Sequence, residues 1–184
     1  MLTRKQEHMD MPDSPGRPGK DEYADFYGPY IAAVEEPLLT GLERDAESWR
    51  ALLAAVPPDR EGYRYADGKW SVREVVAHVI DAERMFSVRT MAFARGDRSH
   101  FPSFDENAYA AASGADRRAL ADLAEEFAAV RTATLLLLRS FEDGAWDRRG
   151  VASGYEFTVR SLAWIIAGHS RHHRGVLAER YLNG

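Results

Sequence analysis

The sequence predicts an all-α protein, a four-helix bundle with a long crossover between its second and third helices. Four segments repeat their apolar residues with the 3.6-residue period of an amphipathic helix, and no convincing strand pattern competes with them. The connection over residues 96–114 is much longer than a turn, as in bundles whose chain crosses over. A chain of 184 residues suits one such domain. We expect residues 21–184 to form it, with residues 1–20 as a disordered tail.

The first two helices have clear boundaries in the sequence. The first is predicted over about 37–56, because Pro37 suits a helix start and Pro57 follows its last apolar residue. The second is predicted over about 71–94. Ser71 and Glu74 have the S-x-x-E spacing of a capping box, which marks its beginning.

The third and fourth helices follow the crossover. The third is predicted over about 116–141, where apolar residues recur at Leu120, Leu123, Phe127, Val130, Leu135 and Leu138. A second connection leads to the fourth helix, predicted over about 158–181. The N-terminal segment is charged and rich in Pro and Gly, without the apolar middle of a signal peptide, so we expect a cytoplasmic protein.

Composition excludes several functions. The net charge is −5 and no dense Lys/Arg cluster occurs, which disfavours nucleic-acid binding. No apolar stretch approaches the roughly 20 residues of a membrane span. Without cysteine, any metal must be held by imidazole and carboxylate, and any thiol chemistry needs a thiol from a cosubstrate.

Histidines are the most informative residues of the chain. His169 and His173 lie four residues apart, so they share one face of the fourth helix. With His169 at zero and about 100° per residue, the apolar face centres near +30°, His173 lies at about +40° and His172 near −60°. The first two therefore face inward, whereas His172 lies at the boundary of the apolar face.

A third histidine, His78, lies in the apolar run VREVVAHVIDAERMF of the second helix. A single histidine on an apolar face is more often a core residue than a metal ligand. Three together favour a metal site, because burying three neutral imidazoles without a shared purpose is costly. Three imidazoles also leave at least one coordination position open, as in a reactive site.

Neighbouring polar residues have weaker candidate roles. Asp81 could orient an imidazole or a bound water, and a surface charge explains it equally well. Glu83 points away from His78, which favours an internal salt bridge or a role in helix packing. His172 could form part of a pocket wall or lie at the boundary of the apolar face. His100 lies in the crossover, where we expect a lid over the substrate. Tyr30 could close over the pocket or belong to an aromatic cluster.

Three stretches carry a family resemblance: RYADGKWSVREVVAHVIDAERMFSVRTMAFARGD, FPSFDENAYAA and AGHSRHHRGVLAERY. Together they resemble the DinB superfamily, in particular its branch of metal-dependent hydrolases, which is similar to bacterial thiol S-transferases. The resemblance covers about residues 23–181 and implies a four-helix bundle with the same crossover. It also implies zinc or nickel held by His78, His169 and His173, and often a homodimer.

The expected function follows from that ligand set. Three neutral imidazoles leave a divalent ion its full charge, so water in the open position is acidified for hydrolysis. The same position can hold the sulfur of a low-molecular-weight thiol, which is the chemistry of a thiol S-transferase. Either enzyme would act on a small molecule. The alternative is a non-catalytic metal-binding bundle, with a structural ion or a small-ligand-binding role.

Overall fold

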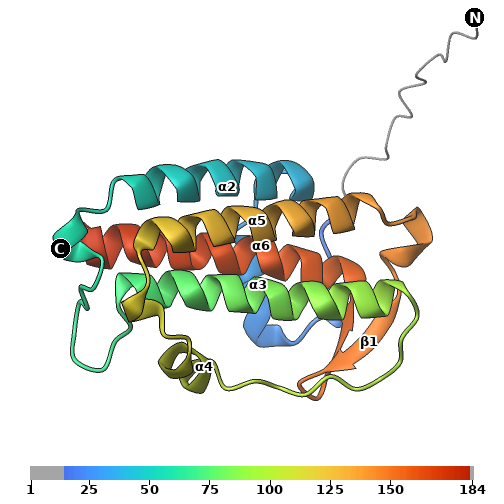
Figure 1. Ribbon diagram of the computed structural model, residues 1–184. Helices are drawn as coiled ribbons and strands as arrows, with labels where there is room; N and C mark the ends of the chain where they lie inside the picture. Colours follow the sequence, from blue (N-terminus) through green and yellow to red (C-terminus); the bar gives the residue numbers. More distant parts are fainter. Residues whose placement is uncertain (1–14, 183–184) are drawn as a thin grey trace, which may run out of the picture.

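Four long helices run side by side in the computed structural model, which describes residues 15–182 (Figure 1). They are α2 (Leu38–Ala54), α3 (Val72–Ala94), α5 (Leu120–Arg139) and α6 (Val159–Val176), the last continued by a π-helical turn over Leu177–Leu182. Both α2 and α3 pack against α5 and α6, and the long crossover joins α3 to α5. The predicted four-helix bundle is confirmed.

Capping groups fix where two of these helices begin. The Ser71 hydroxyl accepts the backbone N–H of Glu74 at 3.1 Å, and the Glu74 carboxylate accepts the N–H of Ser71 at 2.8 Å. At the start of α6, the Thr158 hydroxyl accepts the N–H of Ser161 at 3.0 Å. Each cap satisfies backbone donors that the first helical turn leaves without partners.

Two short helices lie in segments predicted as irregular. The crossover contains α4 (Glu106–Ala112), and the lead-in to the bundle contains α1 (Gly28–Ala32). The Asp105 carboxylate caps α4 by accepting the N–H of Asn107 at 2.9 Å. These elements are too short to show a helical period in the sequence.

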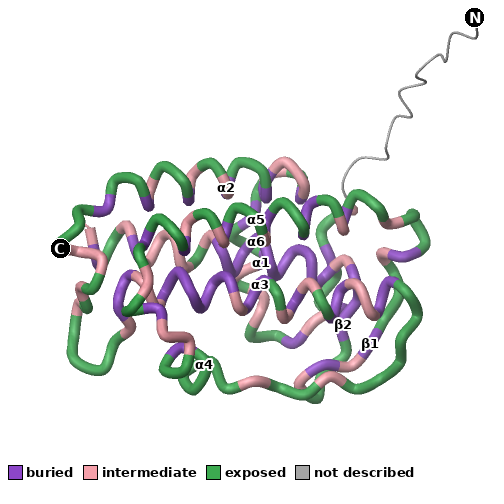
Figure 2. Tube along the Cα trace, viewed as in Figure 1, coloured by how far each residue is buried: buried purple, intermediate pink, exposed green. Residues whose placement is uncertain are grey.

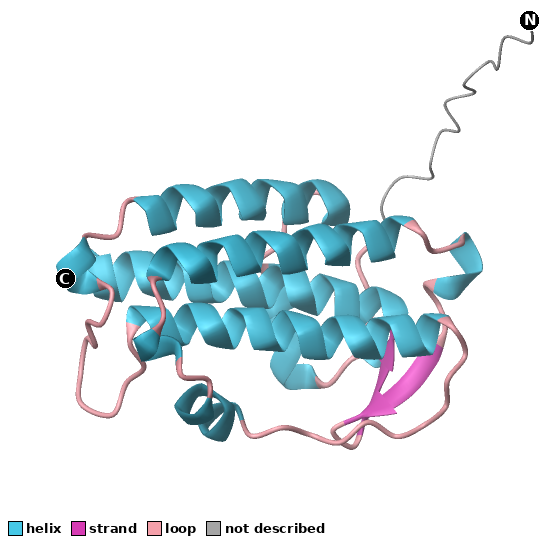
Figure 3. Cartoon of the chain, in the orientation of Figure 1, coloured by secondary structure: helices cyan, strands magenta, loops and turns pink. Residues whose placement is uncertain are grey.

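The expectation that no strand occurs is wrong for the segment before α6. There β1 (Arg149–Ala152) and β2 (Tyr155–Thr158) form an antiparallel hairpin (Figure 3). Its turn is Ser153–Gly154, with φ values of +54° and +82°. Two successive positive φ values are typical of the tight hairpin turns that match strand twist.

Part of the predicted tail lies against the bundle. Arg17 donates hydrogen bonds to the carbonyls of Ile31, at 2.6 Å, and Val34, and its guanidinium lies 4.9 Å from the ring centre of Trp164. These contacts extend the folded domain into the predicted tail. Residues 1–14 lie outside the described part of the chain. Within that part, no helix is both long and apolar enough to cross a membrane.

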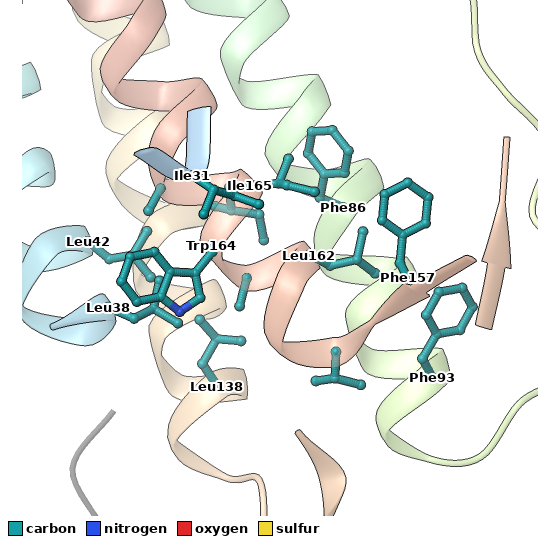
Figure 4. Packing of buried hydrophobic residues seen from close by; sticks show 14 of the residues in the cluster. Ile31, Leu38, Leu42, Phe86, Phe93, Leu138, Phe157, Leu162, Trp164 and Ile165 are labelled. Carbon is teal, nitrogen blue, oxygen red and sulfur yellow. The ribbon is translucent and has the colours of Figure 1, made fainter. Parts of the chain in front are cut away.

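Buried side chains form two apolar clusters. Figure 2 shows buried positions recurring along the long helices of the bundle. Figure 4 shows part of the first cluster, in which Leu42, Phe86 and Leu162 come from three different helices. The second cluster includes Trp49 and Phe127. The two meet at a polar layer across the middle of the bundle.

We call this layer the polar layer and define it by one buried residue from each long helix: Asp45 (α2), Glu83 (α3), Arg131 (α5) and Ser170 (α6). Arg131 donates to Glu83 at 2.8 Å, to Asp45 at 3.3 Å and to the Ser170 hydroxyl at 3.0 Å. The internal salt bridge expected for Glu83 is thereby confirmed. Burial opposes the charge of Arg131, but the Glu83 and Asp45 carboxylates raise its pKa above the usual value.

Candidate metal centre

Three histidines converge beside the polar layer. His78 comes from α3, and His169 and His173 come from successive turns of α6. The Nε2 atoms of His78 and His169 are 3.1 Å apart, and the ring centres of His78 and His173 are 4.7 Å apart. One nitrogen from each ring can be chosen so that all three lie within 4.8 Å of one another. The structure thus brings together the three residues that the sequence selected as metal ligands.

Burial keeps these imidazoles neutral. It lowers the pKa of His78 to about 4 and that of His173 to about 3, with the neighbouring imidazoles contributing to the latter. Burial, followed by the same kind of imidazole–imidazole interaction, lowers the pKa of His169 well below the usual range. Neutral imidazole is the form that ligates metals.

The donor set fits a divalent ion. Tetrahedral Zn–N bonds of about 2.0–2.1 Å require nitrogens roughly 3.3 Å apart, which the observed spacing approaches without rearranging the helices. Three imidazoles suit zinc or nickel better than magnesium or calcium, which prefer oxygen ligands.

A glycine allows α1 to cover this centre. A Cβ atom at Gly168 would lie 2.0 Å from the backbone oxygen of Tyr30, so only glycine permits the observed contact between α1 and α6. The contact places the Tyr30 ring 5.5 Å from the ring of His169, measured between centres. The missing side chain at Gly168 thus allows α1, and with it the Tyr30 ring, to lie close to the histidines.

The histidines form part of the wall of a cavity of about 460 Å³. Six aromatic residues also line it: Phe26, Tyr27, Tyr30, Trp70, Phe86 and Phe104. Ala82 and four polar residues complete the wall: Arg89, Ser103, Glu106 and Ser153. Trp70 packs on His78 with ring centres 4.6 Å apart. A second hollow of about 330 Å³ lies on another side of Trp70 and His173. The three histidines are therefore reachable by a small molecule.

The other candidate residues divide into two groups. Tyr30 lines the main cavity, and the exposed His172 lies beside it, with ring centres 5.3 Å from Tyr30 and 5.0 Å from His173. Asp81 instead lies 3.6 Å from Arg84 on the same helix and does not line this cavity. His100 is exposed on the crossover and does not line it either. The structure therefore does not bring Asp81 and His100 to the histidines.

Arg89 lines the cavity and was missed in the sequence. It is 2% exposed, on the same stripe of α3 as His78, Ala82 and Phe86. Its Nη2 donates to the carbonyl of Pro102 at 2.7 Å, which ties α3 to the crossover. The available signal was a basic residue eleven positions after His78, a spacing that returns to the same helix face.

Two solved structures share this fold. YfiT from Bacillus subtilis, described as a probable metal-dependent hydrolase with an unusual four-helix bundle topology, is 17% identical, with a TM-score of 0.72. That comparison covers 91% of this chain and 93% of that one. The mycothiol-dependent maleylpyruvate isomerase is 16% identical, with a TM-score of 0.62 over 75% of this chain and 58% of that one. No curated protein matches this sequence.

The sequence also matches a family model. The match covers residues 41–177, which begin within α2, end just after α6 and include all three histidines. This is well over half of the chain, and it agrees with the architecture of both solved structures. With its crossover bundle and its histidine pair on the last helix, the chain belongs to the DinB superfamily.

Proposed function

We propose that this protein is a metal-dependent enzyme that acts on a small molecule. The observation that carries the proposal is the convergence of three neutral imidazoles in the wall of a cavity of about 460 Å³. No carboxylate of the described residues joins this ligand cluster, so a bound divalent ion keeps its full charge. Such an ion acts as a Lewis acid and acidifies water or a thiol in its open position.

The chain's own residues prepare the site in three ways. Burial holds His78, His169 and His173 in their neutral, ligating form. The Trp70 and Tyr30 rings, packed on His78 and His169, limit the access of bulk water. The aromatic wall favours a substrate with an apolar body.

Hydrolysis and thiol S-transfer remain the two reactions that we propose. The names of the similar structures support both, one a probable metal-dependent hydrolase and the other a mycothiol-dependent isomerase. Since the chain contains no cysteine, thiol transfer requires a low-molecular-weight thiol as cosubstrate. Zinc or nickel is the expected metal. A homodimer and a cytoplasmic location stay predictions.

Metal content tests the ligand set. In protein purified without a histidine tag, we expect about one equivalent of zinc or nickel in wild type and in His172→Ala, and loss of the metal in His173→Ala. His172 is the matched control because it neighbours His173 and is exposed. Less than half an equivalent in wild type, or equal metal content in His172→Ala and His173→Ala, would contradict the proposal.

A second experiment separates the two reactions. Bacillithiol, mycothiol and glutathione are each mixed with monochlorobimane, and a panel of aryl esters and amides is tested for hydrolysis. Thiol S-transfer predicts conjugation that a chelator abolishes and that His173→Ala lacks. Chelator-sensitive hydrolysis without conjugation identifies a hydrolase. Full metal occupancy without turnover of any of these substrates would favour the non-catalytic alternative.

A further inference from the structure

Arg89 is a buried cation without a carboxylate partner. It is 2% exposed, and among residues 15–182 its guanidinium is assigned no ion pair. Its Nη2 donates to the Pro102 carbonyl at 2.7 Å, and its Nε is buried without an acceptor. Arg131 is just as buried, at 1% exposed, but pairs with both Glu83 and Asp45.

This contrast needs a physical reason. Burying an unpaired charge is costly, and a buried donor without an acceptor adds a further cost. The fold gives Arg131 two carboxylate partners. Arg89 has instead the Pro102 carbonyl, the Ser153 hydroxyl at 3.5 Å and the Phe86 ring, whose centre lies 5.9 Å from the guanidinium, and none of these is charged. The difference is that Arg89 lines the cavity. An anion that enters the cavity would neutralise its charge.

The position of Arg89 defines the shape of such an anion. His78, Ala82, Phe86 and Arg89 form one stripe of α3 along the cavity wall. Toward one end of the stripe, the Arg89 guanidinium lies 5.9 Å from the Phe86 ring centre, and toward the other, that ring centre lies 6.0 Å from the ring centre of His169. The Phe86 ring lies between those ends. The cavity therefore offers ligating nitrogens at one end, a guanidinium at the other and aromatic walls between them.

We propose that Arg89 binds the carboxylate of an elongated small molecule whose apolar body lies along the aromatic wall and whose other end reaches the histidines. The inference rests on the proposed function, in which this cavity is the active site. A guanidinium matches a carboxylate with two parallel hydrogen bonds. Arg89 is the only Lys or Arg among the described residues that line the cavity, and the Glu106 carboxylate in the same wall is not paired with it. A monoanion therefore suits Arg89 better than a phosphate dianion, which the Glu106 charge would repel more strongly.

The test measures binding of three probes by ligand-detected NMR and calorimetry: 4-phenylbutyrate, the neutral 4-phenylbutyramide and phenyl phosphate. Wild type is compared with Arg89→Gln and with Arg98→Gln, which removes the same charge from an exposed site on the crossover. Each protein is studied in chelator-treated and zinc-loaded form. Binding to the chelator-treated form reports on Arg89 even if the protein has no metal-dependent activity.

In the chelator-treated form, we expect wild type to bind 4-phenylbutyrate at least about 10-fold more tightly than either other probe, since a charge-assisted hydrogen bond contributes about that factor. Arg89→Gln should lose this preference, and Arg98→Gln should keep it. If Arg89→Gln does not fold, Arg89→Lys takes its place and should weaken binding because it lacks the planar fork. For the chelator-treated proteins, unchanged carboxylate affinity in the Arg89 variant, or tighter binding of phenyl phosphate than of 4-phenylbutyrate by wild type, would overturn the inference.

Discussion

Two glycines of α6 occupy opposite environments. A Cβ atom at Gly168 would overlap the backbone of Tyr30, whereas one at Gly175 meets no atom within 4 Å. The same Gly→Ala substitution therefore tests the contact between α1 and α6. At Gly175, alanine should raise the free energy of unfolding by up to about 1 kcal/mol, because it favours the helix.

We expect Gly168→Ala to be destabilising by about 1–3 kcal/mol, because the tightly packed contact with α1 has to shift. Urea denaturation of the two variants gives the comparison directly. Displacement of α1 should also change the fluorescence of the nearby Trp164. Equal stability of Gly168→Ala and Gly175→Ala would mean that α1 does not lie on α6 as described.

One ion pair should make stability depend on pH. The Glu36 carboxylate accepts hydrogen bonds from Arg171 at 2.5 and 3.2 Å, and these bonds lower the pKa of Glu36 to about 2. In the unfolded chain, the pKa of a Glu carboxyl is about 4.3, so between about pH 2 and pH 4.3 the folded state binds fewer protons than the unfolded state. The contribution of the Glu36–Arg171 pair to the free energy of unfolding is therefore fully present above about pH 4.5 and is lost as the pH falls toward 2.

The difference between wild type and Glu36→Gln isolates this contribution. We expect wild type to be more stable by on the order of 1 kcal/mol at pH 7, a modest value because the pair is partly solvated. The difference should shrink toward zero near pH 2. Chemical denaturation at several pH values measures it, and a difference independent of pH would rule out the ion pair as its source.

At the scale of elements, the polar layer joins all four long helices through Arg131. The Ser170 hydroxyl donates to Asp45 at 2.5 Å and accepts from the Trp49 indole at 2.9 Å, and Arg174 also donates to Asp45 at 3.0 Å. Since Ser170 directly follows His169, the layer also fixes the position of one candidate metal ligand. The candidate metal centre is therefore held in place by charged groups that do not contact the histidines.

A double-mutant cycle tests the layer. Arg131→Met should cost about 3–5 kcal/mol, because it leaves buried carboxylates without a cation. Adding Glu83→Gln to that variant should cost less than Glu83→Gln costs in wild type, with a coupling of about 1–3 kcal/mol. Strictly additive effects on the free energy of unfolding would contradict a direct Glu83–Arg131 pair.

The long helices were predictable because each carries many repeats of one apolar period. Their ends shifted by a few residues: the third helix begins at Leu120 rather than near residue 116. The hairpin of β1 and β2 was missed because four-residue strands show little periodicity. The Ser153–Gly154 turn was its only local signal.

The site was predictable to a similar degree. Helical spacing selects His169 and His173, and the run around His78 adds the third candidate ligand. Arg89 was missed because what distinguishes it from other buried arginines is the absence of a carboxylate partner. The sequence shows a charge, but only the fold shows whether that charge has a partner.

At the scale of the whole molecule, the candidate metal centre lies beside a core that is complete without it. Two apolar clusters and the polar layer connect the four helices, whereas the histidines link only α3 and α6. Packing thus supplies the main stability of the bundle. A bound ion would then add stability to a bundle that is already folded without it.

We therefore expect chelator-treated protein to keep its helical circular dichroism and to unfold cooperatively. Zinc at a thousandfold excess over its Kd should add about 4 kcal/mol. For a chain of this size, that corresponds to a rise in Tm of about 8–16 °C. His173→Ala should unfold near the Tm of the metal-free protein and show little shift with zinc, whereas His172→Ala should respond like wild type. Loss of helix on chelation would instead identify a structural ion, because a core held by packing alone has no reason to unfold when the ion leaves.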